Sequence, residues 1–221
     1  NVEDEATGTL SFEGTVQEGA TLTADTSNIS DVDGSLTFTF QWQLADDSSS
    51  FDTNSNISGA TNSTFTIPSD QSYVDKFIRL TAVSTDSRGG TTSFETSSQQ
   101  VLNVEDEATG TLSFEGTVQE GATLTADTSN ISDVDGSLTF TFQWQLADDS
   151  SSFDTNSNIS GATNNTFTIP SDQSYVDKFI RLTAVSTDSR GGNTSFETSS
   201  QQVLNVEDEA TGTLIFTGTV Q

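Results

Sequence analysis

The chain has 221 residues, of which 33 are acidic and 6 are basic, and its net charge is −27. A surface this acidic repels nucleic acid and anionic lipid, so neither is expected as a partner. Cysteine and histidine are absent, which excludes disulfides, thiolate metal sites and the commonest general base. No apolar run is long enough to cross a bilayer, so we expect no membrane insertion.

The segment NVEDEATGTL occurs three times, at Asn1, Asn103 and Asn205, which gives a repeat of 102 residues. The two complete copies differ only at Ser63, which is Asn165 in the second, and at Thr91, which is Asn193. We predict two domains, 1–102 and 103–204, followed by 205–221 as the linker and first strand of a truncated third repeat. The chain is expected to be an excerpt of a longer array.

The pattern of each repeat is typical of short strands. Every second residue is apolar from Leu36 to Leu44, which is the alternation of a strand with one buried face. Shorter threonine- and aromatic-rich segments precede and follow it, separated by Gly, Asn, Asp and Ser, and no segment has helical periodicity. The pattern predicts an all-β fold of tandem immunoglobulin-like antiparallel β-sandwich domains, joined end to end by short acidic linkers.

Three residues of the repeat carry specific structural predictions. Trp42 lies on the third strand and is expected at the centre of the core. Phe94 and Val101 are an odd number of positions apart and cannot both point inward along one regular strand, so a bulge or a switch between sheets is expected near 97–100. Asp75 is expected in a turn with positive φ, a conformation that Asp tolerates better than most residues.

The strand order predicts that acidic segments far apart in sequence meet at one end of each domain. If the first strand runs down and the second returns, the loop 30–35 lies at the end where the chain enters, and so does the turn 85–90. The acidic entering segment, 3–5, meets both. Two carboxylates about 6 Å apart repel by roughly 3 kcal/mol at an effective dielectric near 20, so a cation is expected among them.

The expected cation is Ca²⁺, which takes six to eight oxygen ligands in flexible geometry, whereas zinc and copper favour His or Cys. Magnesium is an alternative that would keep more water. Another alternative is that these are ordinary polar loops of an acidic, salt-tolerant protein. Glu18, Asp70 and Asp75 of the preceding domain are candidates for further ligands at a joint. The predicted metal ligands are Glu3, Asp4, Glu5, Asp31, Asp33, Asp86, Glu105, Asp106, Glu107, Asp133, Asp135, Asp188, Glu207, Asp208 and Glu209.

The whole chain resembles the immunoglobulin-like tandem extender repeats of giant RTX-type bacterial adhesins, which are secreted by Gram-negative and often marine bacteria. The matching segments are the joint 2–8, the loop 31–34 before Gln41-Trp42-Gln43, the turn 59–61, and 77–80 leading to Asp86 and Gly89-Gly90. The resemblance implies an extracellular, type I-secreted protein of the cell surface and of biofilms, in which calcium stiffens the joints between repeats. Asp75 departs from the glycine expected there, and the glycine-rich nonapeptides that name RTX proteins are absent from the chain.

The leading functional hypothesis is therefore a mechanical spacer: a monomeric rod, with calcium ions and neighbouring repeats as its partners, that holds a distal binding region away from the cell. The alternative is a carbohydrate- or protein-binding β-sandwich module, with Phe51 or Tyr73 as contacts. An enzyme is not expected, because no pair of acids stands out from the repeated background.

Overall fold

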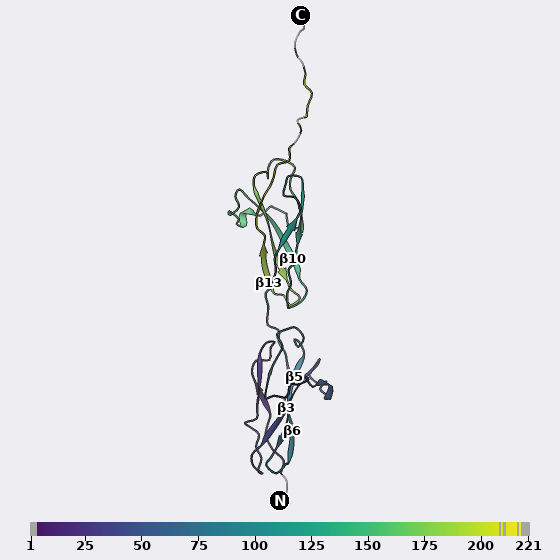
Figure 1. Ribbon diagram of the computed structural model, residues 1–221, viewed down its shortest axis with the longest axis vertical. Helices are drawn as coiled ribbons and strands as arrows, with labels where there is room; N and C mark the ends of the chain where they lie inside the picture. Colours follow the sequence, from purple (N-terminus) through teal and green to yellow (C-terminus); the bar gives the residue numbers. More distant parts are fainter. Residues whose placement is uncertain (1–3, 208, 210, 216, 218–221) are drawn as a thin grey trace. The chain divides into compact units, whose positions relative to one another are not determined.

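The computed structural model describes residues 4–207, 209, 211–215 and 217. The chain divides into two compact units, Asn1–Glu105 and Asp106–Gln221, and each is described by itself (Figure 1). The described residues form strands and two single-turn 3₁₀-helices, with no α-helix, so the predicted all-β class is confirmed. None of the described segments forms a helix that could span a membrane.

Both units contain seven strands and one 3₁₀-turn in the same order. The first unit consists of β1 (Ser11–Glu13), β2 (Thr21–Asp25), β3 (Thr37–Ala45), η1 (Thr53–Ser55), β4 (Thr64–Thr66), β5 (Phe77–Thr85), β6 (Thr91–Glu95) and β7 (Gln99–Gln100). The second unit consists of β8 (Ser113–Glu115), β9 (Thr123–Asp127), β10 (Thr139–Ala147), η2 (Thr155–Ser157), β11 (Thr166–Thr168), β12 (Phe179–Thr187), β13 (Asn193–Glu197) and β14 (Gln201–Gln202).

Each unit is a sandwich of two antiparallel sheets. In the first unit one sheet has the order β1-β2-β4, and the other has the order β3-β5-β6 with β7 also pairing with β5. The second unit repeats this arrangement with β8-β9-β11 and β10-β12-β13. Chain order and pairing match the predicted immunoglobulin-like sandwich, in which the chain crosses between the two sheets.

Trp42 lies at the centre of the first core, as predicted. Its side chain is fully buried, and the indole Nε1 donates a hydrogen bond of 3.0 Å to the carbonyl of Asn62. Phe12 of the opposite sheet meets the indole edge to face at 5.4 Å, and Phe65 stacks on it at 5.9 Å. A buried aromatic ring with its polar atom satisfied contributes both apolar area and a fixed orientation.

The last strand contains the predicted bulge. Thr81 of β5 pairs with Glu95, and Ile78 pairs with Gln99, so three steps along β5 correspond to four along its partner. The extra residue lets both Phe94 and Val101 face the core, and Val101 is fully buried. Thr96 occupies the break: its hydroxyl oxygen accepts the amide of Leu80 at 3.1 Å, which replaces the lost ladder bond.

The turn before β5 has the predicted positive φ, 67° at Asp75, and the corresponding Asp177 has 65°. The Asp75 amide donates to the carbonyl of Val101 at 3.0 Å, and the Val101 amide donates to the carbonyl of Lys76 at 2.8 Å. These two bonds tie the turn to the last strand and hold Asp75 in a conformation that most residues avoid.

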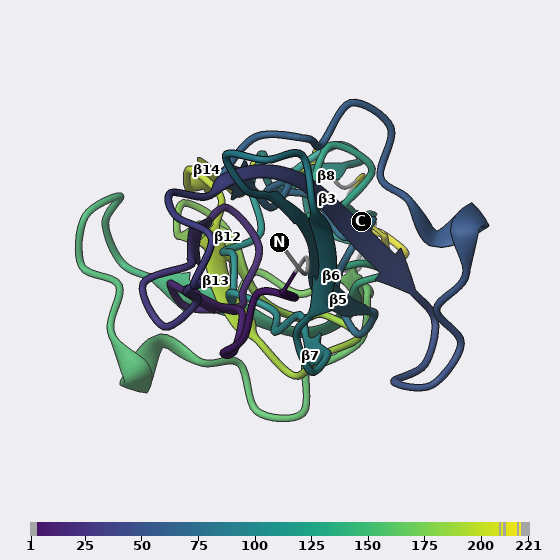
Figure 2. The ribbon, with the colours of Figure 1, turned by 90° about the horizontal axis from the view of Figure 1, so that it is seen from below.

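The segment after β3 stands away from the sandwich (Figures 1 and 2). It carries η1, whose N-terminus is closed by a capping box between Asp52 and Ser55. The buried Gln43 side chain anchors the segment by donating to the Asp52 carbonyl at 3.2 Å and to Asn56 Oδ1 at 2.8 Å. Arg79 donates to Gln43 Oε1 at 2.7 Å, so this projecting segment is fixed at its base by side chains of the sheet.

Candidate metal centre

The entering segment is bound to the first unit by backbone hydrogen bonds. The Asp4 amide donates to Asp33 Oδ2 at 3.1 Å, and the Ala6 amide donates to Thr92 Oγ1 at 3.0 Å. Thr7 and Ser30 then form a two-bond bridge, with both N···O distances 2.9 Å. The chain therefore enters between the loop after β2 and the hairpin of β5 and β6, as the strand order predicts.

Gly8 allows the close approach that this bridge requires. Its φ is +126°, and a Cβ atom there would lie 1.9 Å from the carbonyl oxygen of Asn28. No side chain fits that space, which explains why a glycine follows the acidic segment 3–5 at this position.

The two acidic loops are ordered by their own carboxylates. Asp31 Oδ1 accepts the Asp33 amide at 2.7 Å, which is the local turn that Asp commonly forms. In the β5–β6 hairpin, Asp86 Oδ1 accepts the amides of Arg88 at 2.6 Å and of Gly90 at 3.2 Å. Ser87 Oγ donates to the Asp33 carbonyl at 2.9 Å and so joins the two loops.

These contacts bring three carboxylates together in the first unit. Asp31, Asp33 and Asp86 each offer an oxygen, and the three oxygens lie within 4.8 Å of one another. Two oxygens bound to one Ca²⁺ at 2.3 to 2.6 Å are separated by at most about 5 Å, so the set fits a single calcium ion. Asp86 is only 7% exposed, and removing carboxylates from water is unfavourable unless positive charge or donors surround them.

Arg88 supplies one positive charge to this group. Its Nε lies 3.4 Å from Asp33 Oδ1, and the Arg88 side chain is half exposed whereas that of Asp33 is 7% exposed. One guanidinium for three acidic side chains leaves the group with excess negative charge.

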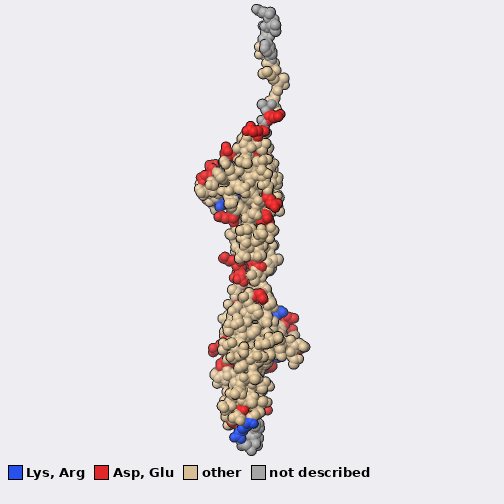
Figure 3. Space-filling view, viewed as in Figure 1, with Lys and Arg blue, Asp and Glu red and all other residues tan. Residues whose placement is uncertain are grey.

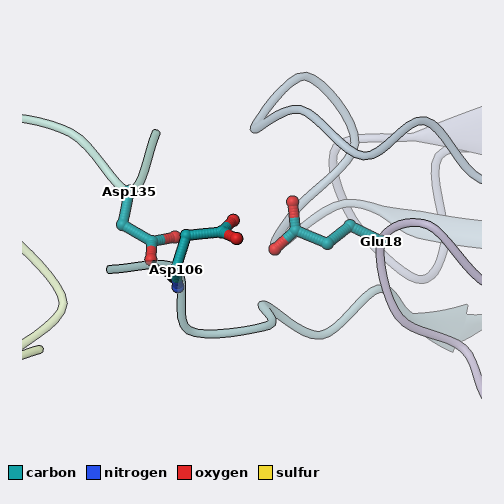
Figure 4. A group of neighbouring side chains, drawn as sticks. All are labelled: Glu18, Asp106 and Asp135. Carbon is teal, nitrogen blue, oxygen red and sulfur yellow. Dashed lines mark hydrogen bonds between the residues drawn. The ribbon is translucent and has the colours of Figure 1, made fainter. Parts of the chain in front are cut away.

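The second unit repeats the hydrogen bonds that order these loops. The Asp106 amide donates to Asp135 Oδ2 at 2.7 Å, and Figure 4 shows these two residues next to each other. The Asp135 amide donates to Asp133 Oδ1 at 2.8 Å. Asp135 and Asp188 are 2% and 7% exposed, and each offers an oxygen within 4.8 Å of the other. Asp188 Oδ1 accepts the Arg190 amide at 2.6 Å, as Asp86 does for Arg88.

The other predicted ligands are placed differently. Glu3 and Asp208 lie outside the described residues. Glu105 is the last residue of the first unit and Asp106 the first of the second, so they flank the division between the units. Among the described residues, no group of three carboxylates includes Asp4, Glu5, Glu107, Asp133, Glu207 or Glu209.

Two of the three candidates from the opposite end of the domain are engaged in turns. Asp70 Oδ1 accepts the Ser72 amide at 2.9 Å, and hydrogen bonds from the Ser72 side chain and amide lower the pKa of Asp70. The Asp75 carbonyl accepts from Gln100 at 3.2 Å. Glu18 is different, because it is 5% exposed and accepts the backbone amide of Val104 at 2.7 Å. In the sequence, Glu18 is marked only as an acid before a glycine, and this signal is too weak to predict that its carboxylate accepts a backbone amide.

The aromatic residues of the alternative binding hypothesis have partners within their own unit. The Arg79 guanidinium lies 4.4 Å from the centre of the Phe51 ring, and Tyr73 stacks on Phe65 at 6.1 Å. A shallow polar hollow of about 300 Å³ lies beside η1, and its lining includes Asp46, Asp52 and Lys76. In the view of Figure 3, acidic side chains appear as separate groups on the surface of each unit.

With two sheets, this strand order and a central tryptophan, each unit belongs to the class of immunoglobulin-like and fibronectin-like β-sandwich domains. Neither a family model nor a curated protein matches the sequence.

Solved structures resemble this chain at low similarity. One is described as a "Ca2+-stabilized adhesin" that "helps an Antarctic bacterium reach out and bind ice"; it is 13% identical, the match covers 93% of this chain and 51% of that one, and the TM-score is 0.36. A second is part of a "1.5-MDa bacterial ice-binding adhesin", 13% identical over 95% of this chain and 68% of that one, with a TM-score of 0.33. A third comprises the fibronectin(III)-like modules of Clostridium thermocellum CbhA, 13% identical over 92% of this chain and all of that one, with a TM-score of 0.29. This chain thus spans about half the length of the first structure.

Proposed function

We propose that this chain consists of extender repeats of a large bacterial cell-surface adhesin, and that calcium ions at the acidic loops stiffen the joints between repeats. In this role the repeats hold a distal binding region away from the cell. The observation that carries the proposal is the convergence of Asp31, Asp33 and Asp86 from two loops at the point where the entering segment docks.

Repetition supports a structural role over a single active centre. The same loop acids occur in both copies, at Asp133, Asp135 and Asp188 in the second. Near-identical copies multiply length and multiply joints, whereas a catalytic site gains little from being copied without change.

Calcium would supply positive charge and oxygen coordination that one arginine does not provide. Asp31, Asp33 and Asp86 would hold the ion in the first copy, and Asp135 and Asp188 would contribute in the second. Because Asp33 already accepts the Asp4 amide, an ion on Asp33 would connect the entering segment to both loops. A ligand that binds only the folded form also raises stability by mass action.

The test is a calcium titration of the chain by calorimetry, with melting temperature and small-angle scattering measured in calcium and in EDTA. We expect saturable binding, a higher melting temperature and a narrower distribution of lengths in calcium. The double variant Asp86→Asn/Asp188→Asn keeps an oxygen acceptor for the loop amides but removes one charge from each site, so it should lose most of the binding. Asp47→Asn/Asp149→Asn, in the projecting segments, is the matched control. Identical melting and scattering with and without calcium would exclude the proposal.

A second candidate, a carbohydrate-binding module, is favoured by the polar hollow beside η1, which recurs in the second unit beside η2. Binding of the chain to a glycan array, lost on changing Asp52 and Asp154 to Ala, would support that role instead.

A further inference from the structure

A buried glutamate holds the chain where it leaves the first unit. Glu18 is 5% exposed, and its Oε1 accepts the Val104 amide at 2.7 Å. The neighbouring backbone pairs in parallel, because the Leu102 amide donates to the Val16 carbonyl at 3.0 Å and the Glu18 amide donates to the Leu102 carbonyl at 3.1 Å. The side chain of Glu18 therefore adds one more hydrogen bond beyond the backbone bridge.

The second unit contains the same contacts. Glu120 is 6% exposed and accepts the Val206 amide at 2.6 Å, while its own amide donates to the Leu204 carbonyl at 3.1 Å. Gln173 Nε2 donates to the other carboxylate oxygen at 2.9 Å. In the first unit the corresponding glutamine, Gln71, lies 3.4 Å from the carboxylate oxygens and 2.8 Å from Oδ1 of Asn103.

The chemistry favours a strong and directional contact. A carboxylate that accepts a backbone amide forms a charge-assisted bond, which is shorter and stronger than a neutral one. The glutamine adds a second donor to the carboxylate, and burial of the carboxylate lowers the local dielectric, which strengthens its hydrogen bonds. The last backbone group before the acidic joint is thus attached to the body of its own unit.

We propose that Glu18 and Glu120 are positioning residues that fix the direction in which the chain leaves each unit, through their hydrogen bonds to the backbone amides of Val104 and Val206. This role goes beyond the proposed calcium function and does not depend on it. Entry into a unit would be stiffened by calcium at the acidic loops, and exit from a unit would be fixed by these hydrogen bonds.

The test is amide hydrogen exchange of the full chain, measured by NMR in excess EDTA. The Val104 and Val206 amides should be protected in the unmodified chain. Glu18→Ala should accelerate exchange at Val104 about ten-fold or more, as expected for loss of a hydrogen bond to a charged group. Val206, in the unaltered copy, and Trp42, in the core of the same unit, should keep their rates.

Two further variants, Glu18→Gln and Glu13→Ala, separate loss of this hydrogen bond from loss of folding or of negative charge. Glu18→Gln retains a carbonyl acceptor without the charge, so Val104 should exchange at an intermediate rate with the core intact, even if Glu18→Ala unfolds the unit. Glu13→Ala removes an exposed acid of β1 and should leave Val104 unaffected. Unprotected Val104 in the unmodified chain while Trp42 stays protected, or an unchanged Val104 rate in Glu18→Gln, would overturn the proposal. Calcium dependence of melting is a separate measurement, so failure of one proposal is distinguishable from failure of the other.

Discussion

Arg88 Nε and Asp33 Oδ1 lie 3.4 Å apart, which places a guanidinium next to the carboxylates proposed to bind calcium. The charges on Arg88 and Ca²⁺ would repel each other if both stayed at the loops. A half-exposed arginine can turn toward solvent when an ion binds, but the ion pair must first be broken.

Arg88→Gln should therefore tighten calcium binding at the first unit. The arginine side of this ion pair is open to solvent, so the pair is worth roughly 1 kcal/mol, and the affinity should rise about two- to five-fold, measured by calorimetry. Lys76→Gln is the control, since Lys76 pairs with Asp46 at 3.6 Å in the projecting segment and should not change the affinity. Weaker binding in Arg88→Gln would mean that the arginine organises the loops for the ion.

Trp42→Ala should destabilise the first unit by about 3 to 5 kcal/mol, because it leaves a cavity at the centre of the core and removes the donor to the Asn62 carbonyl. The chain has two tryptophans, so Trp144 becomes the single fluorescent reporter, and it lies in the second unit. In a urea titration, the unfolding midpoint reported by Trp144 fluorescence should stay the same. Circular dichroism should show an additional transition at lower urea, from unfolding of the first unit. An equal shift of the Trp144 midpoint would instead indicate that the two units unfold together.

Gly8→Ala should cost the first unit about 3 kcal/mol or more, since the new Cβ meets a backbone oxygen at 1.9 Å and the φ of +126° is strained for alanine. Gly59→Ala is the matched comparison: φ is +74° and no atom lies within 4 Å of the added methyl group, so a cost of about 1 kcal/mol is expected. Urea midpoints of the two variants test the difference. Equal losses of unfolding free energy in the two variants would show that the entering segment can move away from the Asn28 carbonyl without destabilising the unit.

The pKa of Asp47 should be measurably low. Hydrogen bonds from the Ser50 side chain, and then from the Ser49 amide and hydroxyl, lower the pKa of Asp47 from 3.8 to about 2. A lowered pKa means that this carboxylate stabilises the folded segment above about pH 4, and that the contribution is lost as the pH falls from there to about 2. A carboxyl ¹³C titration should give a midpoint near 2.

Ser50→Ala should move that midpoint back toward 3.8, because it removes the largest cause of the shift. Asp149, held in the same way by Ser152 and Ser151, should keep its value of about 2 in the same sample. An unchanged Asp47 midpoint in Ser50→Ala would assign the shift to other donors.

The sandwich could be predicted because its determinants are local. Alternation along 36–44 marks the long central strand, and the odd spacing of Phe94 and Val101 requires the extra residue found at the bulge. The convergence of the acidic loops depends only on strand direction, so topology indicates which carboxylates lie near each other without any motif. Whether they bind calcium remains a prediction.

The contacts of Glu18 and Gln43 could not be predicted in this way. Glu18 accepts the backbone amide of Val104, far along the chain, and Gln43 donates to the backbone carbonyl of Asp52 as well as to the side chain of Asn56. A backbone group leaves no signature in the sequence. The capping box at Asp52 and Ser55 did carry a local signal, an acid three residues before a serine, but among so many Asp and Ser residues that signal is not distinctive.

The parallel pairing of 16–18 with 102–104 has a mechanical consequence. A tether that pulls the two ends of a unit apart draws these parallel segments in opposite directions along their length. The hydrogen bonds between the two segments, including the Glu18 contact with Val104, then bear the load at the same time instead of breaking one after another from one end. A domain connected in this way resists extension more strongly than one whose hydrogen bonds break one at a time.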